Sequence, residues 1–354
     1  MKPVENEAET ALESLATEAL GYYGLGCDSL TLTPIQSGGP KALWKVASGK
    51  NTYVLKKFRH APAKVAFTTA AQRYAHRMGA RVPAVIRSRA GGDYVMAGGQ
   101  VFALYEFIHG RPVSWSNPAQ FRRGVEALAE FHVRSRGYAP PPGCQVSSKL
   151  GRWPHQYRSI IDRSREWSVA ARGSTEQFCR LFEQNSGWAV ALAEFASRLL
   201  ERFDYTGWVR EFEKRPGICH QDYGEGNCID RGGDIYILDL DGVTFDIPAR
   251  DIRKVVVKTT AGCGRWDQDH ADEVFSWFQR VNPLRPAQEA VAFADILFPH
   301  TFHDVAKNRF LKGKPTSSGK LAEAIGLELA KASSLKTVFR ERFGVPAAEW
   351  PSLP

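Results

Sequence analysis

The segment ICHQDYGEGNCI, residues 218–229, constrains this chain more than any other part of it. His220, Asp222 and Asn227 follow the spacing H-x-D-x-x-x-x-N, and Asp239 comes shortly afterwards, at the end of the apolar stretch DIYIL. A carboxylate can accept the proton of a hydroxyl group, and an amide oxygen together with a second carboxylate offers the oxygen ligands that Mg²⁺ prefers. The pattern therefore predicts two neighbouring loops that handle a proton and a metal ion.

Three strands are predicted near the start of the chain. Residues 30–36, 43–48 and 52–59 have strand-like composition, and the turn GKN between the last two predicts a hairpin. Because side chains alternate between the two faces of a strand, Val54 and Lys56 share one face. Lys56 fits the strand lysine of the V-A-I-K pattern of kinases, which neutralises phosphate groups, and this match would place Val54 over an adenine ring.

The turn between the first two strands contains Ser37, Gly38 and Gly39. Glycine lets the backbone approach a ligand closely, so we expect this turn to lie over the phosphates of a nucleotide. Two glycines alone are weakly specific for such a role.

The chain changes character near residue 108. A helix at 6–20, a helix from Pro62 to about Met78 and strands up to residue 108 come first, and helices at roughly 118–134, 154–171 and 175–203 follow. The order of strand lysine, H-x-D-x-x-x-x-N loop and downstream aspartate is that of protein kinases. We therefore predict an α+β, bilobal protein kinase-like fold, with a small antiparallel sheet lobe in residues 1–108 and a mostly helical lobe in residues 109–354.

The chain resembles the superfamily of aminoglycoside phosphotransferases and choline kinases, whose loop reads H-G-D-x-x-x-x-N. More closely, it resembles the CotS-type spore coat proteins of endospore-forming bacteria. The resemblance covers nearly the whole chain and is carried by YEFIHGRPV (105–113), LAEFH (128–132), SKLGRWP (148–154), CHQDYGEGN (219–227), LDLDGVTFDIPARDIRKV (238–255) and DILFPHTF (295–302).

The resemblance implies ATP and Mg²⁺ as cofactors and assigns the residues of the pattern to roles. Asp222 would be the catalytic base, His220 would support its loop, and Asp251 would brace that loop. Asn227 and Asp239 would be metal ligands, and Lys56 would bind the phosphates. Residues 105–108 would form a hinge in which Glu106 and Ile108 bind adenine through backbone groups. Asp241 is either a further metal ligand or only a loop carboxylate. The resemblance also implies synthesis in the cytoplasm of the sporulating mother cell and assembly into the spore coat.

Two departures from the kinase pattern bear on activity. Kinases pair the strand lysine with a glutamate on the following helix, but residues 61–92 contain no Asp or Glu, and Gln72 is the nearest polar substitute. Lys56 therefore either finds another carboxylate or belongs to a degraded site. Gln221 replaces the glycine of the H-G-D triplet, which is a milder change.

Two hypotheses about function follow. The first is an ATP- and Mg²⁺-dependent phosphotransferase acting on a hydroxyl of a small molecule, a saccharide or a protein. The second is a catalytically inactive kinase-fold coat component whose role is structural or in assembly. The net charge of +9 favours anionic partners such as nucleotide, acidic polysaccharide or other coat proteins.

Other features of the sequence exclude several classes. The basic residues are dispersed, so nucleic-acid binding is not expected. The acidic, amphipathic beginning of the chain is unlike a signal peptide, and no apolar stretch approaches the roughly 20 residues of a membrane span. The six cysteines are expected to be reduced thiols. His300 and His303 are expected to be capping or surface groups, with a metal cluster as the alternative.

Overall fold

The computed structural model describes residues 3–25, 30–36, 41–261 and 266–354. The chain divides into two compact units, Met1–Ser148 with Arg215–Phe245 and Lys149–Lys214 with Asp246–Pro354. The lobe boundary predicted at residue 108 is a different partition and stays a prediction. The α+β class is confirmed, because an antiparallel sheet forms in the N-terminal region and helices dominate the C-terminal part.

The main sheet of the first unit is antiparallel, with strand order β1-β2-β3-β6-β4 and β5 paired to β6. Its strands are β1 (Leu30–Gln36), β2 (Ala42–Ser48), β3 (Asn51–Phe58), β4 (Val85–Ile86), β5 (Val95–Ala97) and β6 (Gln100–Glu106). The three strands expected at the start of the chain are all present, and the hairpin pairs Ser48 with Asn51.

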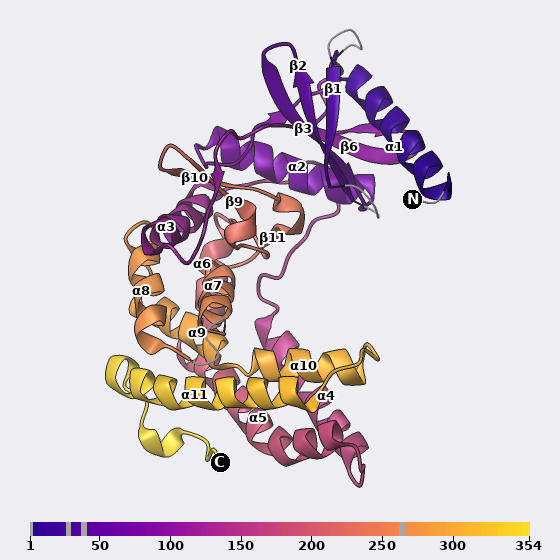
Figure 1. Cartoon of the computed structure of the whole chain (residues 1–354). Helices are drawn as coiled ribbons and strands as arrows, with labels where there is room; N and C mark the ends of the chain where they lie inside the picture. Colours follow the sequence, from indigo (N-terminus) through magenta and orange to yellow (C-terminus); the bar gives the residue numbers. More distant parts are fainter. Residues whose placement is uncertain (1–2, 26–29, 37–40, 262–265) are drawn as a thin grey trace. The chain divides into compact units, whose positions relative to one another are not determined.

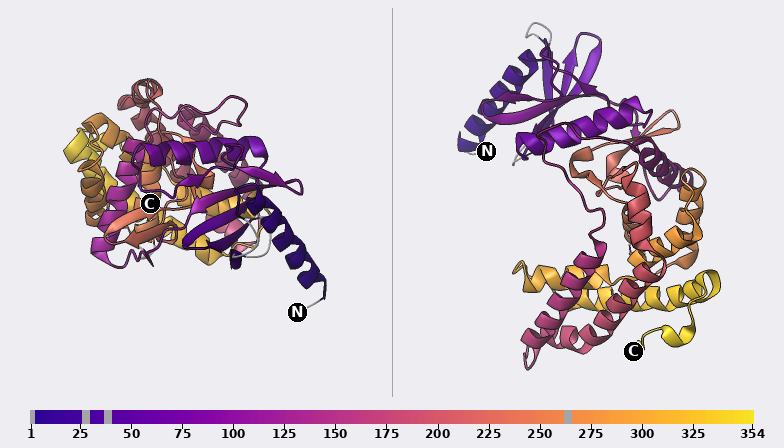
Figure 2. Two further views of the ribbon diagram at one scale, coloured as in Figure 1. Left: turned by 90° about the horizontal axis from the view of Figure 1, so that it is seen from above. Right: turned by 180° about the vertical axis from the view of Figure 1, so that it is seen from behind.

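A helix covers each face of this sheet, as Figure 1 and the rear view in Figure 2 show. Apolar residues of α1 (Pro3–Gly21) pack on the face that carries Leu55 and Phe102. The other face carries Phe58 and Val101, which pack with Val65 of α2 (Pro62–Arg77). Strand alternation assigns Lys56 to this second face, so its ammonium group lies on the α2 side of the sheet.

The remaining elements of the first unit form two smaller sheets and a helix. The sheets have the orders β10-β9-β7 and β11-β8. The elements are β7 (Arg111–Pro112), α3 (Pro118–Arg134), β8 (Ile218–Cys219), the 3₁₀ turn η2 (Glu225–Asn227), β9 (Cys228–Arg231), β10 (Asp234–Ile237), the 3₁₀ turn η3 (Leu240–Gly242) and β11 (Thr244–Phe245). The helix α3 has the bounds that the sequence predicts, because Asn117 caps its N-terminus and Pro118 starts it.

Helices and the loops between them make up the described residues of the second unit. Its helices are α4 (Trp153–Ala171), α5 (Gln177–Arg202), α6 (Tyr205–Glu213), α7 (Ala249–Ala261), α8 (Gln268–Gln279), α9 (Pro286–Leu297), α10 (His300–Phe310), α11 (Ser318–Phe343) and the short η4 (Ala347–Glu349). Every residue from Ala290 to Leu297 is buried, so α9 lies in the core of this unit. Among the described helices, none is long and apolar enough to cross a bilayer.

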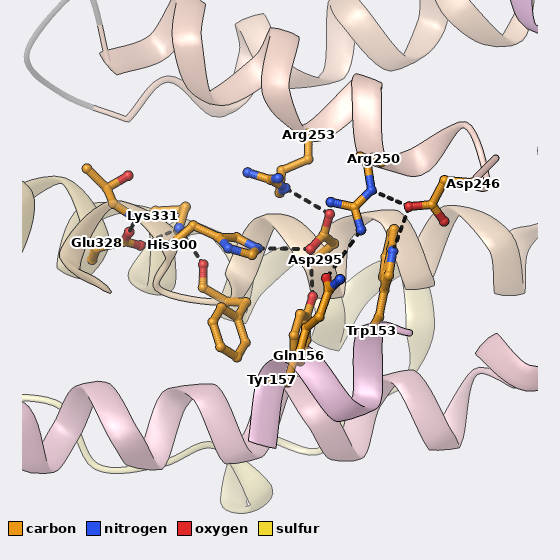
Figure 3. A network of polar contacts seen from close by, with 12 residues as sticks. Trp153, Gln156, Tyr157, Asp246, Arg250, Arg253, Asp295, His300, Glu328 and Lys331 are labelled. Carbon is orange, nitrogen blue, oxygen red and sulfur yellow. Dashed lines mark hydrogen bonds and ion pairs between the residues drawn. The ribbon is translucent and has the colours of Figure 1, made fainter. Parts of the chain in front are cut away.

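A carboxylate lies inside this helical core. Asp295 of α9 is 3% exposed and accepts hydrogen bonds from Tyr157 Oη at 2.6 Å, Arg253 Nε at 2.8 Å and His300 Nε2 at 2.9 Å. Figure 3 shows these groups converging on Asp295 from different helices. Burial alone would raise the pKa of Asp295, but Arg253 and His300 hold it well below its usual range. The carboxylate therefore stays ionised and joins the helices through charge-assisted bonds.

A second buried pair joins α11 to the start of α10. Glu328 Oε1 accepts the backbone N–H of Thr301 at 2.8 Å, and Lys331 forms an ion pair with Glu328. The Lys331 ammonium also donates to the carbonyl oxygen of Phe298 at 3.3 Å. A negative charge at the first turn of a helix is favourable, so Glu328 acts as a cap supplied by another helix.

His300 and His303 are not the capping or surface groups that the sequence predicted. His303 is 4% exposed and stacks on Trp167 at a centroid distance of 5.3 Å, and the ring of His300 bonds to Asp295. Burial lowers the pKa of His300 to about 3, with Arg253 adding to the effect, and burial lowers the pKa of His303 to about 4. Both rings are therefore neutral in the folded protein at pH 7.

We expect the free energy of unfolding to fall as the pH is lowered from 7 to 4.5. In this window His300 and His303 stay neutral when folded but protonate when unfolded, because an unfolded histidine has a pKa of about 6.5. The unfolded state then binds more protons, so each ring contributes a slope of up to about 1.4 kcal/mol per pH unit, with stability rising toward neutral pH.

Urea titrations at several pH values measure this slope. His300→Gln keeps a hydrogen-bond donor near Asp295 and should flatten the slope, and His303→Gln is its counterpart in the second ring environment. Slopes that match the wild-type protein in both variants would show that other groups set the acid sensitivity.

Candidate active site

The strand lysine lies in a buried ion pair. Lys56 of β3 is 5% exposed, and its Nζ lies 2.8 Å from Asp239 Oδ1 and also contacts Asp241 Oδ1. Lys56 thus finds its carboxylates on the loop after β10 and not on α2. Gln72 of α2 is buried nearby in the same pocket and donates its amide to the carbonyl oxygen of Pro83 at 2.8 Å.

Asp239 marks the turn from β10 into η3. Its φ of 59° lies in the left-handed region, which aspartate tolerates better than most residues. Burial would raise the pKa of Asp239, but Lys56 and Lys41 lower it well below its usual range. The carboxylate is therefore fully ionised and available as an anionic ligand.

Lys41 is a residue of the site that sequence reasoning missed. Its Nζ lies 2.8 Å from Asp239 Oδ2 and 3.5 Å from Asp241 Oδ2. Burial lowers the pKa of Lys41, but the interactions with Asp239 and Asp241 together outweigh burial and raise it. A basic residue immediately after the glycine turn was the available signal, because such a turn borders the phosphate region in the predicted fold.

The H-x-D-x-x-x-x-N loop is held by its own hydrogen bonds. His220 is fully buried, its Nε2 donates to the carbonyl oxygen of Leu238 at 2.8 Å, and its Nδ1 accepts the backbone N–H of Asp222 at 3.3 Å. These two hydrogen bonds tie the ring to the backbone of both loops. Asn227 Nδ2 donates to the backbone oxygen of Asp222 at 2.8 Å, while the carboxylate of Asp222 is exposed to solvent.

The predicted nucleotide-binding residues border one pocket of about 400 Å³. Its lining includes Val54, Lys56, Glu106 and Ile108 from the prediction, together with Lys41, Leu43, Tyr105, Phe107, Ile229 and Leu238. The pocket is thus mainly apolar, with Asn227 and Asp239 among its polar lining residues. Ser37, Gly38 and Gly39 lie outside the described residues, so their expected place over the phosphates stays a prediction.

Asp251 belongs to the second unit. It is fully buried in the first turn of α7. Its predicted role as a brace of the catalytic loop stays a prediction. Of the cysteines that the structure describes, Cys144, Cys179, Cys219 and Cys228 are free thiols, and the last three are buried. Cys27 and Cys263 lie outside the described residues.

The donor set suits a hard divalent cation. Asp239 and Asp241 offer carboxylate oxygens, and the engaged nitrogen of Asn227 leaves its side-chain oxygen as the atom that can ligate a metal. Mg²⁺ and Ca²⁺ prefer oxygen ligands of these two kinds. Two lysine ammonium groups at the same carboxylates show that this position stabilises positive charge.

Gln221 is strained in the H-x-D-x-x-x-x-N loop. Its φ of 75° lies in the left-handed region, where a side chain with a Cβ is disfavoured and glycine is not. This position is the one at which the resembling superfamily carries glycine in its H-G-D triplet. The left-handed backbone therefore gives a conformational reason for that glycine. In this chain a glutamine adopts the same backbone conformation despite the strain.

We expect Gln221→Gly to raise the free energy of unfolding by about 0.5–1 kcal/mol, because relief of the left-handed strain outweighs the greater freedom of glycine in the unfolded chain. Gln221→Ala is the matched control, since it removes the side chain but keeps the Cβ. Denaturant titration of the three proteins measures the difference. An equal gain in both variants would assign the effect to the lost side chain and not to φ.

Comparisons of the sequence with known proteins identify its family. The sequence model of the phosphotransferase enzyme family matches residues 31–289. Spore coat protein S of Bacillus subtilis (strain 168) is 25% identical over 329 residues, which span 91% of this chain and 93% of that protein.

Solved structures extend the comparison to the fold. An aminoglycoside phosphotransferase from Alicyclobacillus acidocaldarius subsp. acidocaldarius DSM 446 superposes with a TM-score of 0.74 at 16% identity, covering 93% of this chain and 96% of that chain. The amicoumacin kinase hAmiN, in complex with AMP-PNP, Ca²⁺ and Ami, gives a TM-score of 0.57 at 15% identity, covering 91% and 94%. Spectinomycin phosphotransferase, in complex with ADP and spectinomycin, gives 0.55 at 14% identity, covering 89% and 97%.

These matches confirm the kinase-like fold and the resemblance to spore coat proteins that the sequence motifs indicate. The chain belongs to the phosphotransferase enzyme family and is similar over most of its length to Spore coat protein S.

Proposed function

We propose that the protein is an ATP- and Mg²⁺-dependent phosphotransferase that acts on a hydroxyl group. The observation that carries this proposal is the convergence of Lys56, Asp239 and Asn227 on a pocket whose other walls come from β3 and the segment 105–108. The retained ion pair between the buried strand lysine and Asp239 supports this proposal, because phosphoryl transfer needs both groups beside the nucleotide.

The pocket supports a nucleotide as its ligand. Val54, Ile229 and Leu238 give it apolar walls suited to an adenine ring, and it is also bordered by Glu106, the last residue of β6, and by Ile108, which follows β6. The lysines lie beside the carboxylates, where the phosphates would be neutralised. The related hAmiN and spectinomycin phosphotransferase structures contain AMP-PNP with Ca²⁺ and ADP respectively, which supports the same ligand class here.

Each residue of the site would have a distinct part in the reaction. ATP with Mg²⁺ supplies the transferable phosphoryl group and neutralises its charge. Asn227 and Asp239 would hold the metal, and Lys56 would orient the phosphates. Asp222 would position the acceptor hydroxyl and take its proton as the new O–P bond forms and ADP leaves. Such catalysis consists of placement and electrostatic stabilisation.

The acceptor and the location are proposed from the relatives. We propose a saccharide, a small molecule or a protein side chain as the source of the hydroxyl, since related folds act on different acceptors. The similarity to Spore coat protein S supports a place in the spore coat, and we propose that synthesis takes place in the mother cell. There the net charge of +9 suits acidic polysaccharide or acidic coat partners.

The second candidate is a kinase-fold coat component that does not turn over ATP. It is favoured by the 25% identity to a coat protein and by the lack of any acidic residue in residues 61–92. In this case the ion pairs of Lys56 would serve only stability. The two candidates differ in whether the pocket binds Mg·ATP through Asp239.

Isothermal titration with ATP, in the presence and absence of Mg²⁺, separates them. We expect Mg²⁺-dependent binding that Asp239→Ala weakens by at least about tenfold, because a charged metal ligand is lost. Asp234→Ala is the matched control, since it removes a carboxylate that is 58% exposed at the other end of β10. Asp222→Ala should bind Mg·ATP normally and abolish phosphate transfer in an acceptor screen.

No Mg·ATP binding by the wild-type protein would contradict the phosphotransferase proposal and favour the coat component. Binding that Asp239→Ala leaves unchanged would contradict the assigned metal ligand. Binding with intact Asp239 dependence but with Asp222→Ala as active as wild type would contradict the role of Asp222.

A further inference from the structure

Four charged groups meet at the phosphate end of the pocket. The ammonium groups of Lys41 and Lys56 each contact both carboxylates, Asp239 and Asp241. Each carboxylate uses one oxygen for Lys41 and the other for Lys56, so the four side chains form a closed square of alternating charge. The charges balance within this square, which lowers the cost of holding them away from bulk water.

The two lysines differ in how firmly they are held. The side chain of Lys56 is 6% exposed, lies in the middle of the sheet between β2 and β6, and cannot move without disturbing packed neighbours. The side chain of Lys41 is 27% exposed, and the residue precedes the first residue of β2. Lys41 can therefore leave the square by a change of rotamer, whereas Lys56 is a fixed part of it.

The carboxylate oxygens that Lys41 occupies are oxygens that a metal ion would need. An ammonium group and a divalent cation cannot occupy the same side of one carboxylate, so they compete for Asp239 Oδ2 and Asp241 Oδ2. When a divalent cation displaces the ammonium group of Lys41 from these oxygens, that ammonium group needs another anion nearby. The phosphates of a bound nucleotide are the anions that would lie within its reach in this pocket.

We propose that Lys41 is a second phosphate-binding lysine that stands in for the metal ion at Asp239 and Asp241 until Mg·ATP enters. The inference rests on the proposed nucleotide site and adds a residue to it. Lys41 keeps the two carboxylates neutralised in the empty pocket, weakens binding of a divalent cation alone, and moves to the phosphates when metal and nucleotide bind together. Metal and nucleotide binding thereby become mutually dependent.

Lys41→Met tests the proposal with two opposite expectations. Removing the competing ammonium should strengthen binding of Mn²⁺ alone about tenfold, because the carboxylates lose a charge-assisted partner. Removing a phosphate ligand should weaken binding of Mg·ATP about tenfold. Titration calorimetry measures both affinities without any need for turnover. Lys41→Arg keeps the charge and should restore most of the Mg·ATP affinity.

Lys50→Met is the matched control, because it removes the same charge from the exposed turn between β2 and β3. Its affinities for Mn²⁺ and for Mg·ATP should equal those of the wild-type protein, and thermal unfolding should show that every variant is folded. If the wild type binds Mg·ATP and Lys41→Met changes neither affinity, the Lys41 inference alone is overturned. If the wild type does not bind Mg·ATP, the proposed function falls, and the phosphate role of Lys41 falls with it.

Discussion

The first unit depends on the ion pairs of Lys56. An ammonium group at 5% exposure must be neutralised within the protein, and the carboxylates that do so lie 183 and 185 residues further along the chain. If the loop after β10 did not dock beside β3, the buried ammonium group would be left unpaired, which is strongly destabilising. One electrostatic requirement thus brings together the strand lysine, the aspartates and the loop of His220, and a pocket results between them.

This arrangement explains how a kinase-like site exists without an acidic residue on the helix after β3. Protein kinases use such a glutamate to hold the lysine in place. Here Asp239 and Asp241 hold Lys56 directly, and α2 contributes buried Gln72 and small or apolar residues to the same region. The sheet face that carries Lys56 is packed by α2, so the lysine is oriented by burial as well as by charge.

The second unit also contains buried charged groups that are paired inside the protein. Its core contains ionised Asp295, neutral His300 and the Glu328–Lys331 pair, each with partners from neighbouring helices. Charged groups of this kind stabilise less than apolar residues of equal volume would, but they are strongly destabilising when one partner is missing. The network therefore restricts how these helices can pack, because an alternative packing would leave a buried charge unpaired.

The sequence by itself determined the local elements and the identity of the reactive residues. Strand alternation assigned Val54 and Lys56 to one face, a helix was expected from Pro118, and the spacing of His220, Asp222 and Asn227 indicated a kinase-like loop. These signals depend on neighbours along the chain, so they can be read without a structure. The resemblance to the phosphotransferase family rested on the same local motifs.

Only the tertiary structure decided which distant groups meet. The choice of Asp239 and Asp241 as partners of Lys56, the presence of Lys41 at the same carboxylates and the burial of His303 all involve residues far apart in sequence. Periodicity and composition carry no information about such pairs, because a lysine or a histidine has the same local pattern whether it faces solvent or a distant carboxylate. The left-handed backbone of Gln221 could not be predicted from the sequence for a related reason. The loop is held by the hydrogen bond of His220 to Leu238, and glutamine itself has no preference for a left-handed backbone.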